Sequence, residues 1–176
     1  MMYLILKYHW IFNHRYHDRE WIQSMKIVIG CDHAGFEYKA PIIKFLKEEL
    51  NHEVIDVGCP TNERVDYPDY GEAAARVVAS GQADFGILIC GSGIGIGIAA
   101  NKVNGIRCAL CHDHLTAKLC RNHNNANMIS FGARLIGLDT AFDIVRTFLS
   151  EPFEGGRHVQ RVEKISAIEA KESAKH

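Results

Sequence analysis

The chain has 176 residues, of which 47% are hydrophobic and 23% charged, and its formal net charge is −1. These values are typical of a globular protein and predict one domain with a substantial core. The near-neutral charge argues against a broad nucleic-acid-binding surface, which needs a basic excess. Six cysteines are scattered along the chain and no secretory signal is visible. We therefore expect free thiols in a reducing, cytoplasmic setting rather than disulfides.

Residues 1–24 differ from the rest of the chain because they are rich in aromatic side chains and histidine. Their apolar run is broken by Lys7 and His9. It falls far short of the roughly 20 residues that a membrane-spanning helix needs, so no membrane association is expected. We predict that residues 1–24 are an extension, either disordered or translated from an upstream start. The alternative is a partly ordered arm. Residues 25–176 are predicted to form a single domain with a C-terminal helix.

From Met25 onward, apolar strand patterns alternate with helical ones. The expected strands cover residues 26–30, 53–57, 85–89, 106–111 and 127–131. The expected helices cover residues 36–50, 71–80, 98–102, 113–121, 138–149 and 157–171, and Pro41 should lie near the first turn of its helix. This alternation predicts an α/β fold, a three-layer Rossmann-like sandwich with a five-stranded parallel sheet and helices on both faces. The common strand order 2-1-3-4-5 is assumed, and it places the ligand crevice at the carboxyl ends of the first and third strands.

The central stretch is residues 83–102, in which Cys90 ends an apolar strand. Glycines follow at every second position from 91 to 97, and Ser92 stands between the first two. Glycine lets the backbone approach a ligand closely, and its N–H groups can bind anions or developing negative charge. Cys90 could serve there as a nucleophile or a general base, or it could be a buried structural thiol. A dinucleotide site is disfavoured because the spacing from the strand end is wrong, and no P-loop Gly-Lys-Ser/Thr follows.

Two further clusters contain candidate site residues. Asp32 and His33 follow the first strand, where they could bind sugar hydroxyls or simply cap the next helix. His123 lies in the polar segment 121–125, where it could act as a general acid or belong to an ordinary turn.

The last helix begins with cations, although the helix dipole disfavours positive charge at that end. Arg157 and Arg161 lie four residues apart and share a helix face. Their guanidinium groups could bind an anion such as phosphate. The alternative is a charged surface helix. Arg134 is a further candidate for the same role.

Six motifs in order resemble the family of ribose-5-phosphate isomerase type B, which includes allose- and galactose-6-phosphate isomerases. They are GCDHAGF at 30–36, DYPDY at 66–70, CGSGIGIGIAANK at 90–102, GIR at 105–107, RNHNNANMISFGAR at 121–134 and EGGRHVQRV at 154–162. The resemblance covers nearly all of residues 25–170. It implies interconversion of ribose 5-phosphate and ribulose 5-phosphate through a cis-enediolate in the pentose phosphate pathway, with no metal and no other cofactor.

The resemblance also implies a role for each site residue. Cys90 would move a proton between C1 and C2, since Ile96 stands where some members carry a catalytic glutamate. Ser92 would assist at the substrate oxygens, and His123 would open the furanose ring. Asp32 would be the fourth catalytic residue and would bind or polarise the substrate hydroxyls. The remaining residues would bind the substrate. His33 would lie near the phosphate, Tyr67 would line the pocket, and Asn124 would hold the sugar. The N–H groups of Gly91, Gly93 and Gly95 would stabilise the enediolate, and Arg134, Arg157 and Arg161 would bind the phosphate.

In the family the active site is shared across a homodimer. His123, Asn124 and Arg134 would then come from the partner of the chain that supplies Cys90, and a tetramer is the alternative assembly. We expect the charged tail after Glu163 to embrace the partner subunit. Three other functions stay open at this point: a hexose-6-phosphate isomerase, a non-catalytic module that binds sugar phosphates or nucleotides, and an enzyme with a thiol nucleophile.

Overall fold

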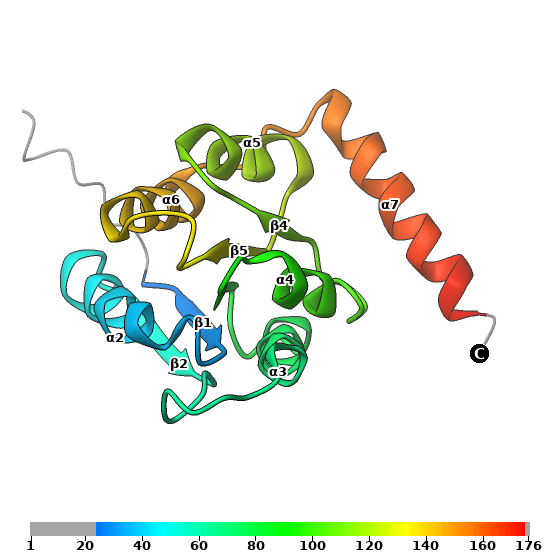
Figure 1. Ribbon diagram of the computed structural model, residues 1–176. Helices are drawn as coiled ribbons and strands as arrows, with labels where there is room; N and C mark the ends of the chain where they lie inside the picture. The colour runs from blue at the N-terminus through cyan, green and yellow to red at the C-terminus, as the bar shows by residue number, and fades with distance from the viewer. Residues whose placement is uncertain (1–23, 175–176) are drawn as a thin grey trace, which may run out of the picture.

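A five-stranded parallel sheet with strand order β2-β1-β3-β5-β4 forms the centre of the molecule (Figure 1). The structure is a computed structural model that describes residues 24–174. All of the predicted extension except its last residue lies outside that range. The strands are β1 (Lys26–Cys31), β2 (Glu53–Asp56), β3 (Phe85–Cys90), β4 (Cys108–Leu110) and β5 (Met128–Gly132). The predicted α/β class is confirmed, and every strand pair is parallel.

The assumed strand order 2-1-3-4-5 is wrong in its last two positions. β5 lies beside β3, in a register that pairs Cys90 with Gly132, and β4 forms the edge. Every residue of β5 is buried, whereas β4 has three residues and none of them is buried. A strand with apolar groups on both faces belongs inside the sheet, where helices cover both sides. As a consequence, the chain that follows β5 lies next to the end of β3.

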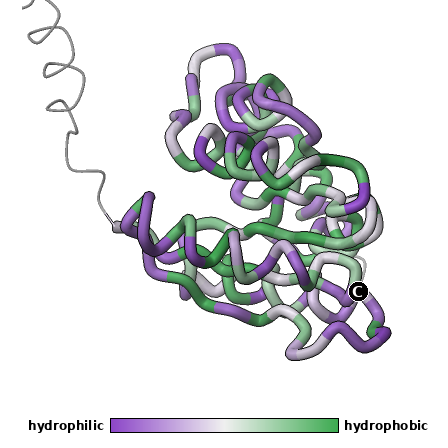
Figure 2. Tube along the Cα trace, turned by 60° about the vertical axis from the view of Figure 1, so that its left-hand side comes forward, coloured by the Kyte–Doolittle hydropathy of each residue, from purple (hydrophilic) through white to green (hydrophobic). Residues whose placement is uncertain are grey.

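Helices cover both faces of the sheet (Figure 1), and hydrophobic segments run through the middle of the molecule (Figure 2). Alternate strand residues enter two separate cores. In β1, the side chains of Ile27, Ile29 and Cys31 point to one face of the sheet, where they pack in the core formed with α2, η1, α5 and α6. The side chain of Val28 points to the other face, where it packs in the core formed with α3 and α4. This alternation follows from the two-residue period of a strand. The helical segments are α2 (Phe36–Lys44), the π-helical turn η1 (Phe45–Glu49), α3 (Tyr67–Ala79), α4 (Ile94–Ala100), α5 (His114–Asn124), α6 (Leu138–Ser150) and α7 (Arg157–Ser173).

Several helix boundaries differ from the sequence prediction. α3 begins at Tyr67 rather than at residue 71, because Pro68 falls in its first turn, where a missing N–H costs nothing. α4 begins at Ile94, so two of the loop glycines are helical. Pro41 lies within α2 instead of near its first turn. The predicted helix 36–50 ends as a π-helical turn, in which the Leu50 N–H donates to the Phe45 carbonyl at 3.1 Å.

Helix α7 projects from the body of the molecule and contacts α5 near its start (Figure 1). Gly155 and Gly156 both have positive φ, at 66° and 54°, and this turns the chain into α7. Ile165 and Ile168 on α7 are 46% and 62% exposed. Within residues 24–174, none of the helices is both long and apolar enough to cross a membrane.

Candidate active site

The thiol of Cys90 lies at the end of β3, under the turn into α4. Its side chain is buried, and its Sγ accepts the N–H of Gly93 at 3.1 Å. Ser92 Oγ accepts the N–H of Ile94 at 3.3 Å. The N–H of Gly95 lies in the first turn of α4, where no intrahelical acceptor is available. The turn therefore places one backbone N–H donor on the sulfur and leaves the N–H of Gly95 without an intrahelical partner.

Two glycines allow this turn to pack directly against β5. Gly93 has φ of 79°, and a Cβ at this position would lie 2.6 Å from the carbonyl carbon of Phe131. A Cβ on Gly132 would lie 2.7 Å from the backbone of Ser92. Any side chain at either position would therefore push the loop away from the strand.

Asp32 and His33 border the turn at the end of β1. Asp32 Oδ1 accepts the N–H groups of Ala34 at 2.9 Å and Gly35 at 3.1 Å in the turn before α2. No side chain caps α2, so Asp32 holds this turn and does not cap the helix. Oδ2 has no hydrogen bond to another residue in the described part of the chain, and it is available to a ligand. His33 Nδ1 lies 3.3 Å from the backbone nitrogen and 3.2 Å from the backbone oxygen of Val65, which fixes the ring.

Tyr67 and Arg134 complete this group from two other elements. A Cβ on Gly95 would lie 2.6 Å from the ring of Tyr67, which is 42% exposed. The backbone N–H of Arg134 donates to the Gly91 carbonyl at 3.2 Å, and Arg134 Nη1 lies 3.4 Å from the position a Gly91 Cβ would take. The prediction that Arg134 comes from the partner of the Cys90 chain is therefore wrong. β5 pairs with β3, and this places Arg134 on the loop of its own chain.

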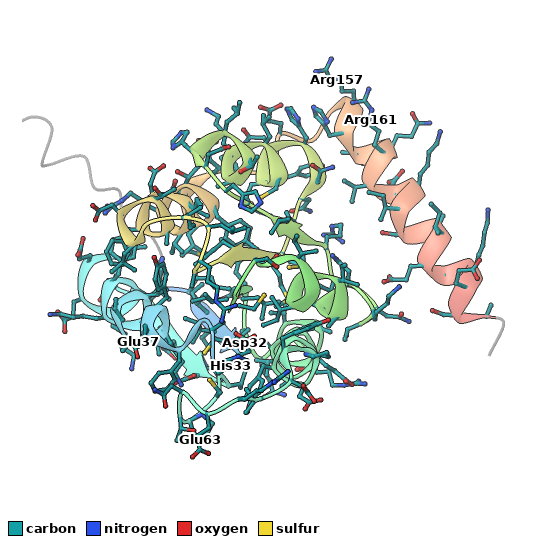
Figure 3. All side chains as sticks on the ribbon, in the orientation of Figure 1. Asp32, His33, Glu37, Glu63, Arg157 and Arg161 are labelled. Atoms are coloured by element: carbon teal, nitrogen blue, oxygen red, sulfur yellow. The ribbon has the colours of Figure 1, made fainter. Side chains whose placement is uncertain are left out.

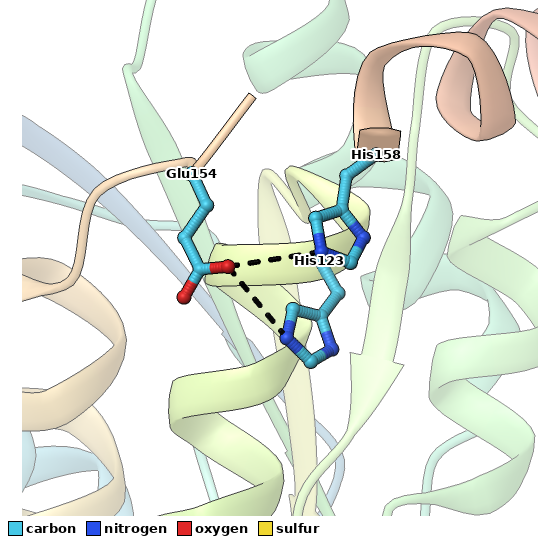
Figure 4. A group of neighbouring side chains, drawn as sticks. All are labelled: His123, Glu154 and His158. Carbon is cyan, nitrogen blue, oxygen red and sulfur yellow. Dashed lines mark ion pairs between the residues drawn. The ribbon is translucent and has the colours of Figure 1, made fainter. Parts of the chain in front are cut away.

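A second group of candidate residues gathers where α5 meets α7 (Figure 4). His123, in the last turn of α5, stacks on His158 with ring centroids 4.3 Å apart and planes 5° apart. Its Nε2 lies 3.9 Å from Glu154 Oε2, and His158 Nε2 lies 3.7 Å from the same oxygen. Arg157 Nε points at His158 Nε2 from 3.5 Å. Asn124 and Arg161 are exposed beside this group.

The stacked histidines have different surroundings. His158 is only 4% exposed. Its burial lowers its pKa, and the positive charges of His123, Arg157 and Arg161 lower it further, against the opposing effect of Glu154. His158 is therefore neutral at neutral pH.

The ligand atoms of His123, Glu154 and His158 lie within 4.8 Å of one another, close enough to consider a metal ion. However, a metal lies in the plane of each imidazole that binds it, and two parallel ring planes share no such point. The stack as it stands therefore does not suit a metal.

The predicted site residues thus form two separate groups within one chain. Figure 3 shows Arg157 and Arg161 at the outer end of α7, well away from Asp32 and His33. We call the first group the thiol-loop cluster; its members are Asp32, His33, Tyr67, Cys90, Gly91, Ser92, Gly93, Gly95 and Arg134. We call the second the α5–α7 cluster; its members are His123, Asn124, Glu154, Arg157, His158 and Arg161.

Sequence reasoning did not single out Glu154, His158 or Gly132. Glu154 and His158 lie in the same EGGRH segment as Arg157. The position of His158 next to Arg157, a cation at a helix start where the dipole disfavours positive charge, could have pointed to a role for this histidine. Gly132 ends a buried strand, and its role depends on the β3–β5 pairing, which the sequence pattern does not reveal.

Comparison with known proteins places these clusters in a family context. Residues 27–165 match the family model described as Ribose/Galactose Isomerase. The chain is 51% identical over 144 residues to ribose-5-phosphate isomerase B of Escherichia coli strain K12, covering 82% of this chain and 96% of that protein. Ribose-5-phosphate isomerase B of Clostridium thermocellum superposes with a TM-score of 0.82 at 54% identity, covering 84% of this chain and 99% of that one. The Mycoplasma genitalium enzyme, solved with bound ribulose-5-phosphate, gives a TM-score of 0.79 at 39% identity, covering 84% and 98%.

Proposed function

The chain belongs to the ribose/galactose isomerase family, and we propose that it interconverts D-ribose 5-phosphate and D-ribulose 5-phosphate through a cis-enediolate. The observation that carries this proposal is the Cys90 thiol, which accepts the Gly93 N–H of the glycine turn at the end of β3, the strand that pairs with β1 just before Asp32. The names of the Escherichia coli and Clostridium relatives, and the ligand of the Mycoplasma structure, support the choice of substrate.

The proposed chemistry begins with a proton on C2, next to the C1 carbonyl. Cys90 removes this proton and returns it to C1, so the aldose becomes a ketose without any net redox change. The main cost is the negative charge of the enediolate. Backbone N–H groups of Gly91, Gly93 and Gly95 are proposed to stabilise that charge, and each such donor is worth about 3–4 kcal/mol in comparable oxyanion sites. The Gly93 N–H, which donates to Cys90 Sγ in the free chain, would have to turn from the sulfur to the substrate oxygen. Ser92 assists at the substrate oxygens, where its hydroxyl can donate or accept a proton.

The remaining residues bind and prepare the substrate. The furanose ring must open before C2 becomes acidic, and His123 serves as the acid and base for that step. Arg157 and Arg161 bind the phosphate, with Arg134 and His33 on the thiol-loop side. Binding energy from the phosphate then orients C1 and C2, although the phosphate takes no part in bond making.

We also propose that the protein is a homodimer, in which the α5–α7 cluster of one subunit completes the thiol-loop cluster of the other. Two observations support this. The clusters lie apart within one chain (Figure 3). A groove of about 600 Å³ separates α7 from the body, and exposed Ile165 and Ile168 line it. A second subunit would cover such apolar side chains.

A cytoplasmic location is part of the same proposal. All six cysteines are free, including the neighbouring pair Cys31 and Cys59, whose sulfurs lie 3.8 Å apart without a bond. Free thiols at this spacing fit a reducing compartment.

Conversion of ribose 5-phosphate to ribulose 5-phosphate in the presence of a chelator tests the proposed function. Allose 6-phosphate is the matched comparison, because it is one CHOH unit longer. We expect turnover of ribose 5-phosphate that the chelator does not reduce, and a lower kcat/KM for the hexose phosphate. Failure to convert either sugar would refute the proposal, and a preference for the hexose phosphate would change its substrate.

A further inference from the structure

The imidazole of His123 has an unusual environment for an acid–base group. Within residues 24–174 it makes no hydrogen bond to another residue. The two interactions that orient it are the parallel stack on His158 at 4.3 Å and the ion pair with Glu154 at 3.9 Å. A catalytic histidine normally has one ring nitrogen fixed by a hydrogen bond. In this protein the stack and the ion pair orient the His123 ring instead.

The segment that carries Glu154 is clamped firmly to the end of α5. Asn122 is buried, and its Nδ2 donates to the Pro152 carbonyl at 2.8 Å and to Glu151 Oε2 at 3.0 Å. The Glu154 N–H donates to the Asn122 carbonyl at 3.1 Å. Asn122 immediately precedes His123, so the backbone of the histidine and the backbone of its carboxylate partner are held by one residue.

His158 is the link between His123 and the phosphate arginines. The positive φ of Gly155 and Gly156 starts α7 so that the second residue of the helix lies flat on His123 (Figure 4). The same ring presents Nε2 to Arg157 Nε at 3.5 Å and to Glu154 Oε2 at 3.7 Å, so this nitrogen contacts both the guanidinium and the carboxylate. His158 is buried and does not reach the surface as a ligand group would. A neutral ring also avoids placing two imidazolium charges face to face.

We propose that His158 and Glu154 are positioning residues for the ring-opening step, and that His158 aligns both the His123 imidazole and the Arg157 guanidinium. This inference rests on the proposed function, because it assumes that His123 opens the sugar ring. The stack fixes the plane of the His123 ring. The Glu154 carboxylate, 3.9 Å from His123 Nε2, orients that ring nitrogen. The contact with Arg157 fixes the position of the phosphate-binding guanidinium relative to the His123 ring.

A pair of substrates separates ring opening from proton transfer. Ribose 5-phosphate must open its furanose ring, whereas 4-deoxyribose 5-phosphate lacks the hydroxyl that closes that ring and is always open-chain. In the His158→Ala variant we expect kcat/KM for ribose 5-phosphate to fall about 10- to 100-fold further than kcat/KM for the analogue, the cost of a misplaced catalytic group. Glu154→Gln should act in the same direction. His112→Ala, which alters an exposed histidine before α5, is the control.

Two more variants distinguish positioning from a general structural role. His158→Phe keeps a flat ring on His123 but offers no acceptor to Arg157. His158→Gln keeps an acceptor but has no ring. We expect His158→Phe to restore the ratio of the two kcat/KM values while the KM for ribose 5-phosphate stays raised, and His158→Gln not to restore the ratio. Equal losses on both substrates, or a His158→Phe variant no better than His158→Gln, would overturn the inference.

A second measurement does not need the analogue. In a Cys90→Ala background proton transfer is blocked, but ring opening and closing still exchange the two anomers of ribose 5-phosphate. NMR exchange spectroscopy should detect exchange above the buffer rate, and adding His158→Ala should bring it close to that rate. Unchanged exchange in the double variant, or none in the Cys90→Ala parent, would overturn the inference. A wild-type protein that does not convert ribose 5-phosphate would instead refute the proposed function.

Discussion

At the scale of single residues, the six cysteines differ in what surrounds their sulfur atoms. Cys90 Sγ accepts a backbone N–H from Gly93 at 3.1 Å. Cys31, at the end of the neighbouring strand, packs against Cys59 instead, and burial together with that neighbour raises the pKa of the Cys31 thiol to about 12. Burial also raises the pKa of Cys108 to about 12. A buried thiol becomes reactive only where its environment favours the thiolate, and the raised pKa values of Cys31 and Cys108 mean that burial prevails at those two sulfurs.

This contrast predicts a labelling pattern. Cys31 and Cys108 should resist iodoacetamide in the native protein at about pH 8, since their thiols stay protonated well above that pH. Both should react after denaturation. Peptide mass spectrometry before and after unfolding would measure this. Rapid native labelling of Cys31 would contradict the account of its burial.

His52 gives a pH-dependent contribution to stability. Its ring is buried and Nδ1 lies 3.4 Å from the Met25 N–H, and burial lowers its pKa below the ordinary value of 6.5, against the effect of Asp84. The unfolded chain therefore binds a proton more readily than the native chain. The free energy of unfolding should fall as pH drops below about 6.5, the unfolded value.

Denaturant unfolding at about pH 7.5 and pH 5.5 checks this prediction, and a His52→Gln variant should lose less stability across that interval. The pKa of His158 is lowered as well, so the free energy of unfolding of the variant should still change somewhat with pH. An identical slope in wild type and variant would contradict the prediction.

At the scale of elements, the thiol loop depends on the pairing of β3 with β5. That pairing brings Gly132 against the backbone of Ser92 and puts Arg134 beside Gly91. The sequence could predict the strands themselves, because each is a short apolar run between turn signals. It could not predict their neighbours, since pairing depends on how the whole sheet is covered. The structure settles the order, since every residue of β5 is buried and none of β4 is.

Gly132→Ala tests this packing. The new methyl group would lie 2.7 Å from the Ser92 backbone, so the strand or the loop must shift. We expect a loss of about 1–3 kcal/mol in stability, as in other overpacked sites, together with a strong loss of turnover. Thermal unfolding and an isomerase assay measure both. Gly137→Ala is the matched control, because nothing lies within 4 Å of its Cβ position and it should change neither property.

Asn122→Ala tests the clamp between α5 and the start of α7. It removes the two part-buried hydrogen bonds that Asn122 donates to Pro152 and Glu151. A typical hydrogen bond contributes about 0.5–1.5 kcal/mol, so we expect a destabilisation of about 1–3 kcal/mol for the two and a lower kcat on ribose 5-phosphate. Asn104→Ala, which removes an exposed bond to Ser173, should leave both unchanged. Equal effects of the two variants would contradict the role of the clamp.

At the scale of the whole molecule, the two clusters lie apart in one chain and would meet only between subunits. The sequence motifs identified most members of both clusters, and the family resemblance predicted that His123, Asn124 and Arg134 come from the partner of the Cys90 chain. For Arg134 this prediction was wrong, because the pairing of β5 with β3 places Arg134 beside Gly91 of its own chain. The sequence alone did not identify Glu154 and His158, since their role appears only once α7 is placed against α5.

Co-expression of Cys90→Ala and His123→Ala chains tests the shared site. In a mixed dimer one site carries both substitutions and the other carries neither. Random pairing should therefore give about a quarter of wild-type activity, although each variant alone is nearly inactive. If both clusters served the same chain, every site would contain one substitution and the mixture would stay inactive.

The most direct measurement of the central claim is the turnover of Cys90→Ala with ribose 5-phosphate, set beside the binding of the same sugar phosphate. We expect the rate to fall by at least about 100-fold, the usual contribution of an acid–base group, with the dissociation constant largely unchanged. Full activity in that variant would contradict the assignment of Cys90 as the proton carrier.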